Sequence, residues 1–271
     1  MIFHSAFENS YLWYPLIGFV VGLIGTFIGG GGGFFFIPVL TLLFGQQTNV
    51  ALATSIAATL PICIIGTIGH YRNGNVKVGT GLIFAAAGVL GAFSGASITS
   101  LITARQLKVS WGIYTILIAF QIIITTWKKK RDEAKGVVKP ENTRIKKIAT
   151  GSFYGFLAGI ITATFGTSGA TPTQAGMFAM RMPVKAVIGT SLMVVMVNNA
   201  SALGAHFIIG QIDLTQVYFL TAGTIAGALL GPKLLRGVRI EGAEGPIRQL
   251  YALGMIVFGI LMIFLNGGNK G

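Results

Sequence analysis

Charged residues are scarce in this chain of 271 residues. Only 10% are Asp, Glu, Lys or Arg, against roughly a quarter in ordinary soluble domains, and only seven are acidic, against 20 that are basic. Uncharged apolar runs such as 50–70 and 79–102 are close to the roughly 20 residues that a helix needs to cross a bilayer. The composition therefore excludes an ordinary soluble domain and predicts an all-α polytopic membrane protein.

Cysteine, histidine and acidic residues are too few for several kinds of chemistry. The single cysteine, Cys63, cannot form an intramolecular disulfide, and three histidines without clustered carboxylates do not suggest a metal site. The glycine run 29–33 does not match the nucleotide-binding pattern G-x-G-x-x-G, and no G-K-[ST] follows it. We therefore expect no enzyme, no cofactor, no metal site and no ATP-driven pump within this chain.

The net charge of +13 is distributed unevenly along the chain. Nine of the 20 Lys and Arg residues lie in 128–147, the only long polar stretch, and the others are scattered over short loops. Positive loops on one side of a membrane explain this pattern better than a nucleic-acid partner does. We expect the lipid bilayer as the partner, the cell inner (plasma) membrane as the location, and 128–147 as a basic cytoplasmic linker.

An internal repeat spans this linker. The run that starts at Gly18 aligns with the run that starts at Gly155, and four glycines match at a constant offset of 137. Further along, "ATS" at 53–55 aligns with "GTS" at 189–191, now at an offset of 136. A slip of one residue over some 55 positions is hard to attribute to chance. The chain is therefore interpreted as a duplicated unit.

Each copy contains five apolar helical segments. One segment in each copy, 34–44 or 171–180, is too short to cross a hydrocarbon core of about 30 Å as a straight helix. We expect four full spans plus one short broken or re-entrant helix in each repeat, and eight to ten transmembrane helices in all. The divisions are a first transmembrane repeat (1–127), the linker (128–147) and a second transmembrane repeat (148–271). The predicted segments are 11–28, 34–44, 49–69, 79–101, 109–127, 148–166, 171–180, 184–207, 215–232 and 249–266.

Loop charges distinguish two arrangements of the repeats. If the short segments cross the membrane, each repeat has five crossings and the second copy is inverted; if they re-enter, each has four and the copies are parallel. With the linker in the cytoplasm, the inverted arrangement places 17 basic residues inside and three outside, whereas the parallel one places 12 inside and eight outside. The positive-inside rule therefore favours two inverted repeats, with both termini outside.

Equivalent interruptions, Gly29–Gly33 and Gly166–Thr171, follow the first helix of each repeat. Non-helical backbone inside a membrane must be buried in protein or line a wet cavity, and glycine permits unusual dihedral angles. Thr171 before Pro172 suggests an N-cap, so the following half-helix would direct N–H groups toward the break, an arrangement that binds anions. The alternative is that the small residues serve tight helix packing.

Several polar residues lie inside the apolar spans, where they are costly and often functional. The alternatives are hydrogen bonds to the preceding turn for Ser and Thr and interhelical hydrogen bonds for Asn. No predicted span contains an acidic residue, so the pathway lacks a carboxylate proton relay and suits an anion. The candidate substrate-binding residues are Gly29, Gly30, Gly31, Gly32, Gly33, Thr54, Ser55, Gly166, Thr167, Ser168, Gly169, Thr171, Gln174, Thr190, Ser191, Asn198 and Asn199.

Two histidines, His70 and His206, also occupy equivalent positions in the repeats. In the inverted arrangement they lie near opposite faces of the membrane. We interpret them either as residues of a gate or of proton handling, or as interfacial anchors.

The sequence resembles the sulfite exporter TauE/SafE family of membrane transporters. The resemblance rests on "GFVVGLIGTFIGGGGGFFFIPVL" from 18 to 40, on "ALATSIAATLPICIIGTIGHYRNGNVKVG" that follows, and on the second copy "GTSLMVVMVNNASALGAHFIIGQID". It covers about 14 to 265 and implies the export or uptake of small sulfur-containing or organic anions, namely sulfite, sulfoacetate and related sulfonates. The second break, "TFGTSGATP", replaces the glycine run with polar residues, so equal contributions of the two halves do not follow.

These observations predict a secondary transporter that moves a small anion by alternating access of two inverted halves. The alternative is a non-transporting membrane scaffold or assembly factor in which the polar residues serve packing. The identity of the anion, the direction of transport, the coupling ion and the presence of a homo-oligomer stay open at this point.

Overall fold

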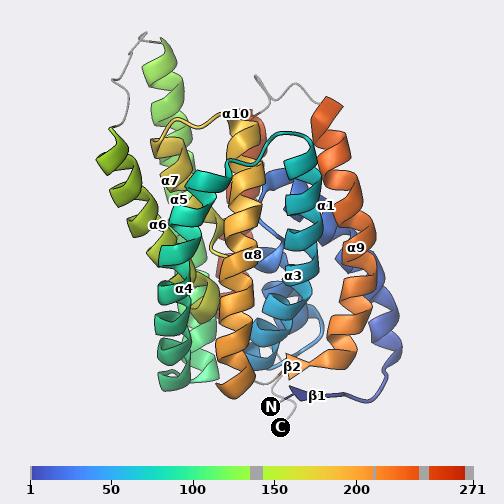
Figure 1. Cartoon of the computed structure of the whole chain (residues 1–271). Coiled ribbons are helices and arrows are strands. Elements are labelled where there is room, and N and C mark those ends of the chain that lie inside the picture. Colours follow the sequence, from blue (N-terminus) through green and yellow to red (C-terminus); the bar gives the residue numbers. More distant parts are fainter. Residues whose placement is uncertain (1, 135–142, 210–211, 238–243, 266–271) are drawn as a thin grey trace.

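The computed structural model describes residues 2–134, 143–209, 212–237 and 244–265, which form a bundle of long helices (Figure 1). Seven of the described helices are long and apolar enough to cross a membrane, which confirms the predicted all-α polytopic membrane protein. The elements are β1 (Ile2–Phe3), η1 (Asn9–Trp13), α1 (Tyr14–Ile28), α2 (Gly33–Pro38), η2 (Val39–Leu43), α3 (Thr48–Arg72), α4 (Val78–Leu101), α5 (Ala104–Ala134), α6 (Arg144–Phe165), α7 (Ala170–Ala179), α8 (Val184–Ile209), β2 (Ile212–Asp213), α9 (Leu214–Gly237) and α10 (Glu244–Phe264).

Helix covers more of the predicted linker than its polar sequence suggests. Helix α5 continues to Ala134 and α6 begins at Arg144, so residues at both ends of 128–147 are helical. Lys and Arg are good helix formers, and the end of the apolar run therefore does not mark the end of the helix. Residues 135–142 of the linker lie outside the described residues.

Corresponding helices of the two halves make corresponding contacts. Helix α1 packs against α9 and α6 packs against α4, while α3 packs against α9 and α8 against α4. Because the repeat relates α1 to α6, α3 to α8 and α4 to α9, each contact has a counterpart. Two further pairs, α3 with α8 and α5 with α10, each join two equivalent helices. Most of the packing therefore occurs between halves rather than within them.

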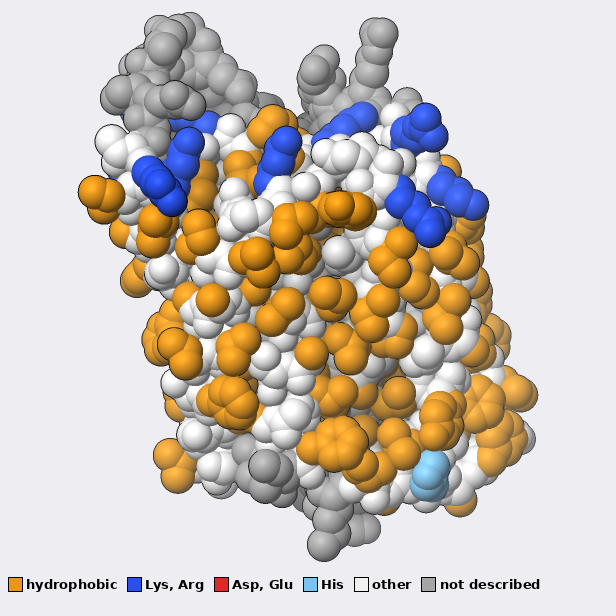
Figure 2. Space-filling model, viewed as in Figure 1, with side chains coloured by type: hydrophobic (Ala, Val, Ile, Leu, Met, Phe, Trp, Pro, Cys, Tyr) orange, Lys and Arg blue, Asp and Glu red, His pale blue; other side chains and the backbone are white. Residues whose placement is uncertain are grey.

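The surface has a hydrophobic flank and one basic end. Hydrophobic side chains cover the flank in Figure 2, and Lys and Arg side chains gather at the upper end. Helix α3, with the exposed Arg72 in its last turn, ends at this basic end, whereas α8 ends at the opposite end, beside β2 (Figures 1 and 2). The corresponding helices α3 and α8 therefore run in opposite directions.

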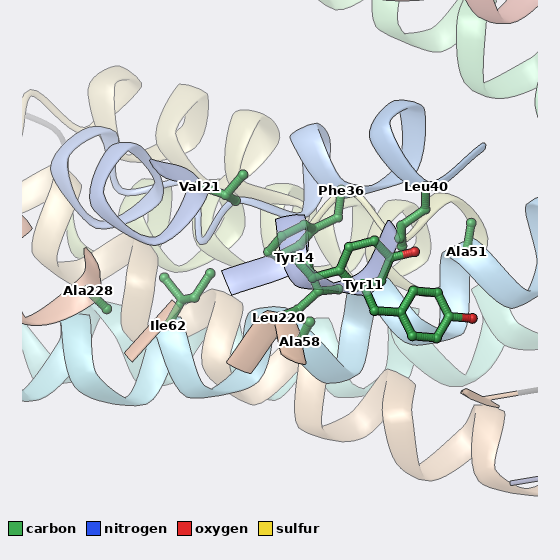
Figure 3. Close-up of a cluster of buried hydrophobic side chains, with 10 residues drawn as sticks. All are labelled: Tyr11, Tyr14, Val21, Phe36, Leu40, Ala51, Ala58, Ile62, Leu220 and Ala228. Carbon is green, nitrogen blue, oxygen red and sulfur yellow. The ribbon is translucent and has the colours of Figure 1, made fainter. Parts of the chain in front are cut away.

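A cluster of buried side chains holds the first short helix in the bundle. It gathers residues from α1, α2, α3 and α9 (Figure 3), including Phe36 of α2, which is fully buried. Tyr11 and Tyr14 also belong to this cluster and are buried. The short helix α2 is therefore packed within the bundle. The non-helical break that precedes it must also be buried in protein or line a cavity at membrane depth.

Glycines allow the helix pairs α1–α9 and α4–α6 to approach closely. A Cβ on Gly22 would lie 2.5 Å from the carbonyl oxygen of Thr224, and a Cβ on Gly159 would lie 2.8 Å from the backbone nitrogen of Ala92. Real Cβ contacts are not this short. These glycines therefore serve close packing, which is a common use of small residues between membrane helices.

We expect Gly22→Ala to lower the thermal unfolding temperature of the purified protein in detergent. The added methyl group meets backbone atoms that cannot move aside, and such overpacking costs about 1–3 kcal/mol. Gly254→Ala is the matched control, because a Cβ there meets nothing within 4 Å. Equal unfolding temperatures for the two variants would contradict the packing role.

The N-terminal residues contact the segment at the start of α9. Strand β1 pairs in parallel with β2, with Ile2 opposite Ile212. The buried carboxylate of Asp213 accepts hydrogen bonds from the backbone nitrogens of Ser5 (3.3 Å) and Thr215 (3.1 Å). Asp213 thus satisfies one N–H group of the N-terminal segment and one in the first turn of α9. The sequence predicted neither the strand pair nor this buried acid.

Candidate functional site

The structure interrupts the first helix of each half in the same way. The C-cap of helix α1 is Gly29 (φ 81°) and that of α6 is Gly166 (φ 64°), both in the left-handed conformation. The following helices α2 and α7 begin after Gly32 (φ 88°) and Gly169 (φ 54°), which are also left-handed. Side chains are disfavoured in this conformation, so the paired glycines explain why both helices stop where they do.

Thr171 does not have the predicted capping role. Helix α7 begins at Ala170, and its N-cap is Gly169, which makes no side-chain hydrogen bond. The left-handed Gly169 directs the chain into the helix before Thr171 is reached. Thr171 and Pro172 therefore lie in the first turn of α7, and the prediction that Thr171 is the N-cap was wrong.

The two breaks lie against each other. Ser168 Oγ in the second break donates a 2.7 Å hydrogen bond to the carbonyl oxygen of Gly30 in the first. A Cβ on Gly33 would lie 2.6 Å from the carbonyl oxygen of Gly166, so only glycine fits there. Residues more than 130 positions apart thus form one continuous patch of non-helical backbone, buried between the halves.

Each break is contacted by one serine of the opposite half, and the two serines are equivalent in the repeat. Ser191 Oγ on α8 donates to the carbonyl oxygen of Gly29, at 2.8 Å. Ser55 Oγ on α3 lies 3.3 Å from the carbonyl oxygen of Gly166. Because the repeat relates Ser55 to Ser191 and Gly29 to Gly166, these are the same contact made twice. The predicted residues of both halves therefore meet at the breaks.

Gln174 makes the two breaks unequal. Its Nε2 atom on α7 donates to the carbonyl oxygen of Ile28, at 2.9 Å, and lies 3.4 Å from Ser191 Oγ. At the offset of 137 the first half carries Ile37 instead. Among the described residues, the second half therefore places an amide side chain at the patch where the first half has an apolar one.

Thr54 and Thr190 lie one residue before Ser55 and Ser191 and contact groups outside the breaks. Thr190 Oγ1 accepts a 2.9 Å hydrogen bond from the backbone nitrogen of Lys77. Thr54 Oγ1 accepts a 3.4 Å hydrogen bond from the backbone nitrogen of Asp213. These donors precede α4 and α9, so each threonine of one half fixes the start of a helix of the other half, away from the breaks.

His70 and His206 are buried and are not interfacial anchors. His70 Nε2 lies 3.0 Å from the carbonyl oxygen of Thr26, and His206 Nε2 lies 2.7 Å from that of Ala163. Since a carbonyl only accepts, each Nε2 carries the proton. Both carbonyls belong to the last turn of a broken helix, where they have no intrahelical partner. The anchor interpretation was wrong, and a gating role stays a prediction.

We expect His206→Ala to lower the unfolding temperature, and His206→Gln to restore part of the loss. The alanine variant leaves the carbonyl of Ala163 with only the longer 3.2 Å contact from Thr99 Oγ1, a hydroxyl that also donates to Gly95. A buried carbonyl that loses its main donor costs up to about 1–3 kcal/mol, whereas glutamine keeps an N–H donor. Thermal unfolding in detergent measures the difference, with the exposed His4→Ala as the control. An unchanged unfolding temperature in His206→Ala would contradict this role.

Three predicted residues carry buried polar atoms that have no hydrogen-bond partner within the described residues. The atoms are Thr167 Oγ1, both polar atoms of the Asn198 side chain, and Asn199 Oδ1. An unpaired buried polar group costs about 1–3 kcal/mol, so each is a group that a ligand can satisfy.

The two asparagines face different helices. Asn199 Nδ2 lies 3.9 Å from Cys63 Sγ on α3, and a Cβ on Gly31 would lie 2.7 Å from the same sulfur. Asn199 therefore lies close to the first break. Asn198 packs against Gly88 of α4, so the structure does not bring it to the breaks.

Aromatic residues of α5 stack on the phenylalanines that flank the two breaks. Phe34 follows the first break directly and stacks on Trp111, with ring centroids 5.4 Å apart. Phe165 precedes the second break directly and stacks on Tyr114, at 5.0 Å. Trp111 and Tyr114 were not predicted from the sequence, although a phenylalanine beside each glycine break is a visible signal. Helix α5 thus contacts the chain at both breaks.

Comparisons with known proteins identify a matching family and several relatives. The model of the family described as "Sulfite exporter TauE/SafE" matches residues 14–262. The probable membrane transporter protein YdhB of Bacillus subtilis is 30% identical over 219 residues, which are 80% of this chain and 87% of that protein. The probable membrane transporter protein YunE of the same organism is 24% identical over 94% of this chain and 98% of its own length.

A similar protein occurs in another bacterium. A probable membrane transporter protein of Xylella fastidiosa is 27% identical over 251 residues, covering 92% of both chains. No solved structure matches the chain. The family match, the full-length relatives and the long apolar helices lead to one conclusion. The chain belongs to the sulfite exporter TauE/SafE family and is a multi-pass membrane transporter.

Proposed function

We propose that the protein is a secondary transporter that moves small anions, sulfite or organosulfonates such as sulfoacetate, by alternating access of two inverted halves. The observation that carries this proposal is the pair of equivalent serine contacts, Ser191 with Gly29 and Ser55 with Gly166. Inverted halves that meet at interrupted helices are a recurring plan of secondary transporters, with the substrate at the interface.

The opposite directions of α3 and α8 support the inverted arrangement (Figure 1). A transporter built from two inverted copies can exchange the conformations of its halves, and so open to one side and then to the other. The contacts between the breaks and the opposite half are the ones that such an exchange must rearrange. We place the basic end of Figure 2 in the cytoplasm, following the positive-inside rule.

The chemistry of the second break supports an anion as the substrate. Its left-handed N-cap, Gly169, precedes the ten-residue helix α7, whose first N–H groups have no intrahelical acceptor. The unpartnered hydroxyl of Thr167 lies in this break, and the amide of Gln174 on α7 donates to the carbonyl oxygen of Ile28, beside the first break. Sulfite and sulfonate groups present three oxygen acceptors, which match N–H and O–H donors. The family description adds sulfur to this anion class.

We expect sulfite or sulfoacetate to raise the unfolding temperature of the purified protein. A ligand that binds only the folded state adds about 2.7 kcal/mol at a concentration of 100 times its Kd. The test compares sulfite, thiosulfate, sulfoacetate and sulfate with chloride at equal ionic strength. No shift with any of these anions would favour the alternative, a membrane scaffold that transports nothing.

A further inference from the structure

We propose that the oxygen atoms around Ser55 bind Na⁺, which moves together with the anion. This inference rests on the proposed anion transport and names its coupling ion. Three oxygens converge here from three elements: Ser55 Oγ of α3, the carbonyl oxygen of Gly33 at the start of α2, and the carbonyl oxygen of Gly166 at the end of α6. All three residues are buried.

Hydrogen bonding alone explains these contacts poorly. Ser55 Oγ lies 3.2 Å from one carbonyl oxygen and 3.3 Å from the other, whereas O–H···O bonds are usually about 2.7–2.8 Å long. A hydroxyl has one proton and can donate fully to only one of them. The equivalent Ser191 differs, because its oxygens lie at 2.8 and 3.0 Å. Of the two equivalent serines, Ser55 therefore has the more widely spaced oxygen neighbours.

The spacing fits a cation of the size of Na⁺. An octahedral cation with metal–oxygen distances of about 2.4 Å, as for Ca²⁺, places neighbouring ligands about 3.4 Å apart. Na⁺ has nearly the same ionic radius as Ca²⁺, and K⁺ is larger and needs wider spacing. The two distances from Ser55 Oγ therefore match two edges of a Na⁺ coordination shell, with each carbonyl contributing a lone pair.

The charges of the surroundings favour a monovalent ion. The three converging ligands are neutral, whereas protein sites for Ca²⁺ use carboxylates. Across the described ranges, no group of three His, Cys, Asp or Glu residues is arranged to hold a metal ion. Helix α6 ends at Phe165, directly before Gly166, so the negative end of its dipole lies at the oxygens. A dipole and neutral oxygens suit Na⁺ and offer too little charge for a divalent ion.

A fourth oxygen is available at the same break. Thr167 follows Gly166 directly, and its buried Oγ1 has no hydrogen-bond partner within the described residues. Half-helix ends and unwound carbonyls are the groups that hold coupling cations in other transporters with interrupted helices. The first N–H groups of α7 and the amide of Gln174, which face an anion in the proposed function, lie beyond Gly169 along the chain. Thr167 can serve both ions, because its oxygen has lone pairs for Na⁺ while its O–H donates to the anion.

Binding of ²²Na⁺ to the purified protein in detergent tests the site without requiring transport. We expect saturable binding to the wild type that excess Na⁺ displaces and equal K⁺ does not. Ser55→Ala should weaken this binding at least about tenfold, which corresponds to about 1.4 kcal/mol, and Ser55→Thr should retain it. Ser94→Ala is the matched control, because its exposed hydroxyl bonds only to Leu90 of its own helix.

Two results would overturn the site. One is the absence of saturable ²²Na⁺ binding to the wild type, which holds whether or not Ser55→Ala folds. The other is wild-type affinity in a Ser55→Ala protein that elutes as a single folded species in size exclusion.

Sulfite flux into liposomes separates this inference from the proposed function. Flux that falls when choline replaces Na⁺ supports the coupling ion. Equal flux in Na⁺, K⁺ and choline would contradict Na⁺ coupling and leave anion transport intact. Saturable ²²Na⁺ binding without flux of any tested anion would contradict the proposed function and leave the cation site intact.

Discussion

Gly29→Ala is expected to abolish transport. Gly29 has a φ of 81°, and a Cβ there would lie 2.8 Å from the Cα and carbonyl oxygen of Ile188 and from Ser191 Oγ. The left-handed conformation costs an alanine about 1–2 kcal/mol, and the overlap with α8 backbone adds about 1–3 kcal/mol. Because the added methyl group separates the first break from the opposite half, we expect sulfite flux into liposomes to fall by at least about a hundredfold, the equivalent of about 2.7 kcal/mol.

Gly45→Ala is the control for this variant. Gly45 has the same left-handed conformation, with a φ of 64°, but a Cβ there meets nothing within 4 Å. Gly45→Ala therefore introduces the cost of a left-handed alanine without the steric overlap that Gly29→Ala creates. If Gly29→Ala inserted at normal levels and transported sulfite as fast as Gly45→Ala, the break would have no part in transport.

Ser191→Ala is expected to have the second largest effect. The substitution removes the 2.8 Å hydrogen bond to Gly29 and also a neighbour of Gln174 Nε2. A buried carbonyl left without its donor costs about 1–3 kcal/mol, and here it lies at the proposed substrate site. We expect the maximal rate of sulfite flux to fall about tenfold, since about 1.4 kcal/mol in a barrier changes a rate tenfold.

Ser201→Ala separates this effect from the general loss of a hydroxyl on α8. Ser201 Oγ donates to the carbonyl of Val197 within its own helix, so its loss should leave flux close to that of the wild type. Equal flux in Ser191→Ala and Ser201→Ala proteins, at equal amounts in the liposomes, would show that the contact between Ser191 and the first break does not contribute to transport.

Local patterns in the sequence were sufficient to predict the helices and the two breaks. Uncharged runs of about 20 residues mark membrane spans because the bilayer requires that length. Two of the four glycine pairs that the repeat matches, Gly29 with Gly166 and Gly32 with Gly169, have left-handed backbone, which other residues rarely tolerate. The repeat also correctly paired Ser55 with Ser191, whose contacts are equivalent.

Features that depend on the packing of distant segments could not be predicted. The position of Thr171 follows from the left-handed Gly169, and the burial of His206 follows from its contact with Ala163, 43 residues earlier. The stacking of Trp111 on Phe34 requires α5 to lie against both breaks. A single sequence carries the residue types for these contacts, but the partners are set only by the tertiary arrangement of the helices.

The most direct test of the account is the initial rate of sulfite flux into liposomes that contain the purified protein. We expect a rate that saturates with sulfite concentration, is inhibited by sulfoacetate, and is lost in Gly29→Ala but kept in Gly45→Ala. A rate equal to that of protein-free liposomes, for sulfite and for every organosulfonate tested, would contradict the claim that the two meeting helix breaks form the binding site of an anion transporter.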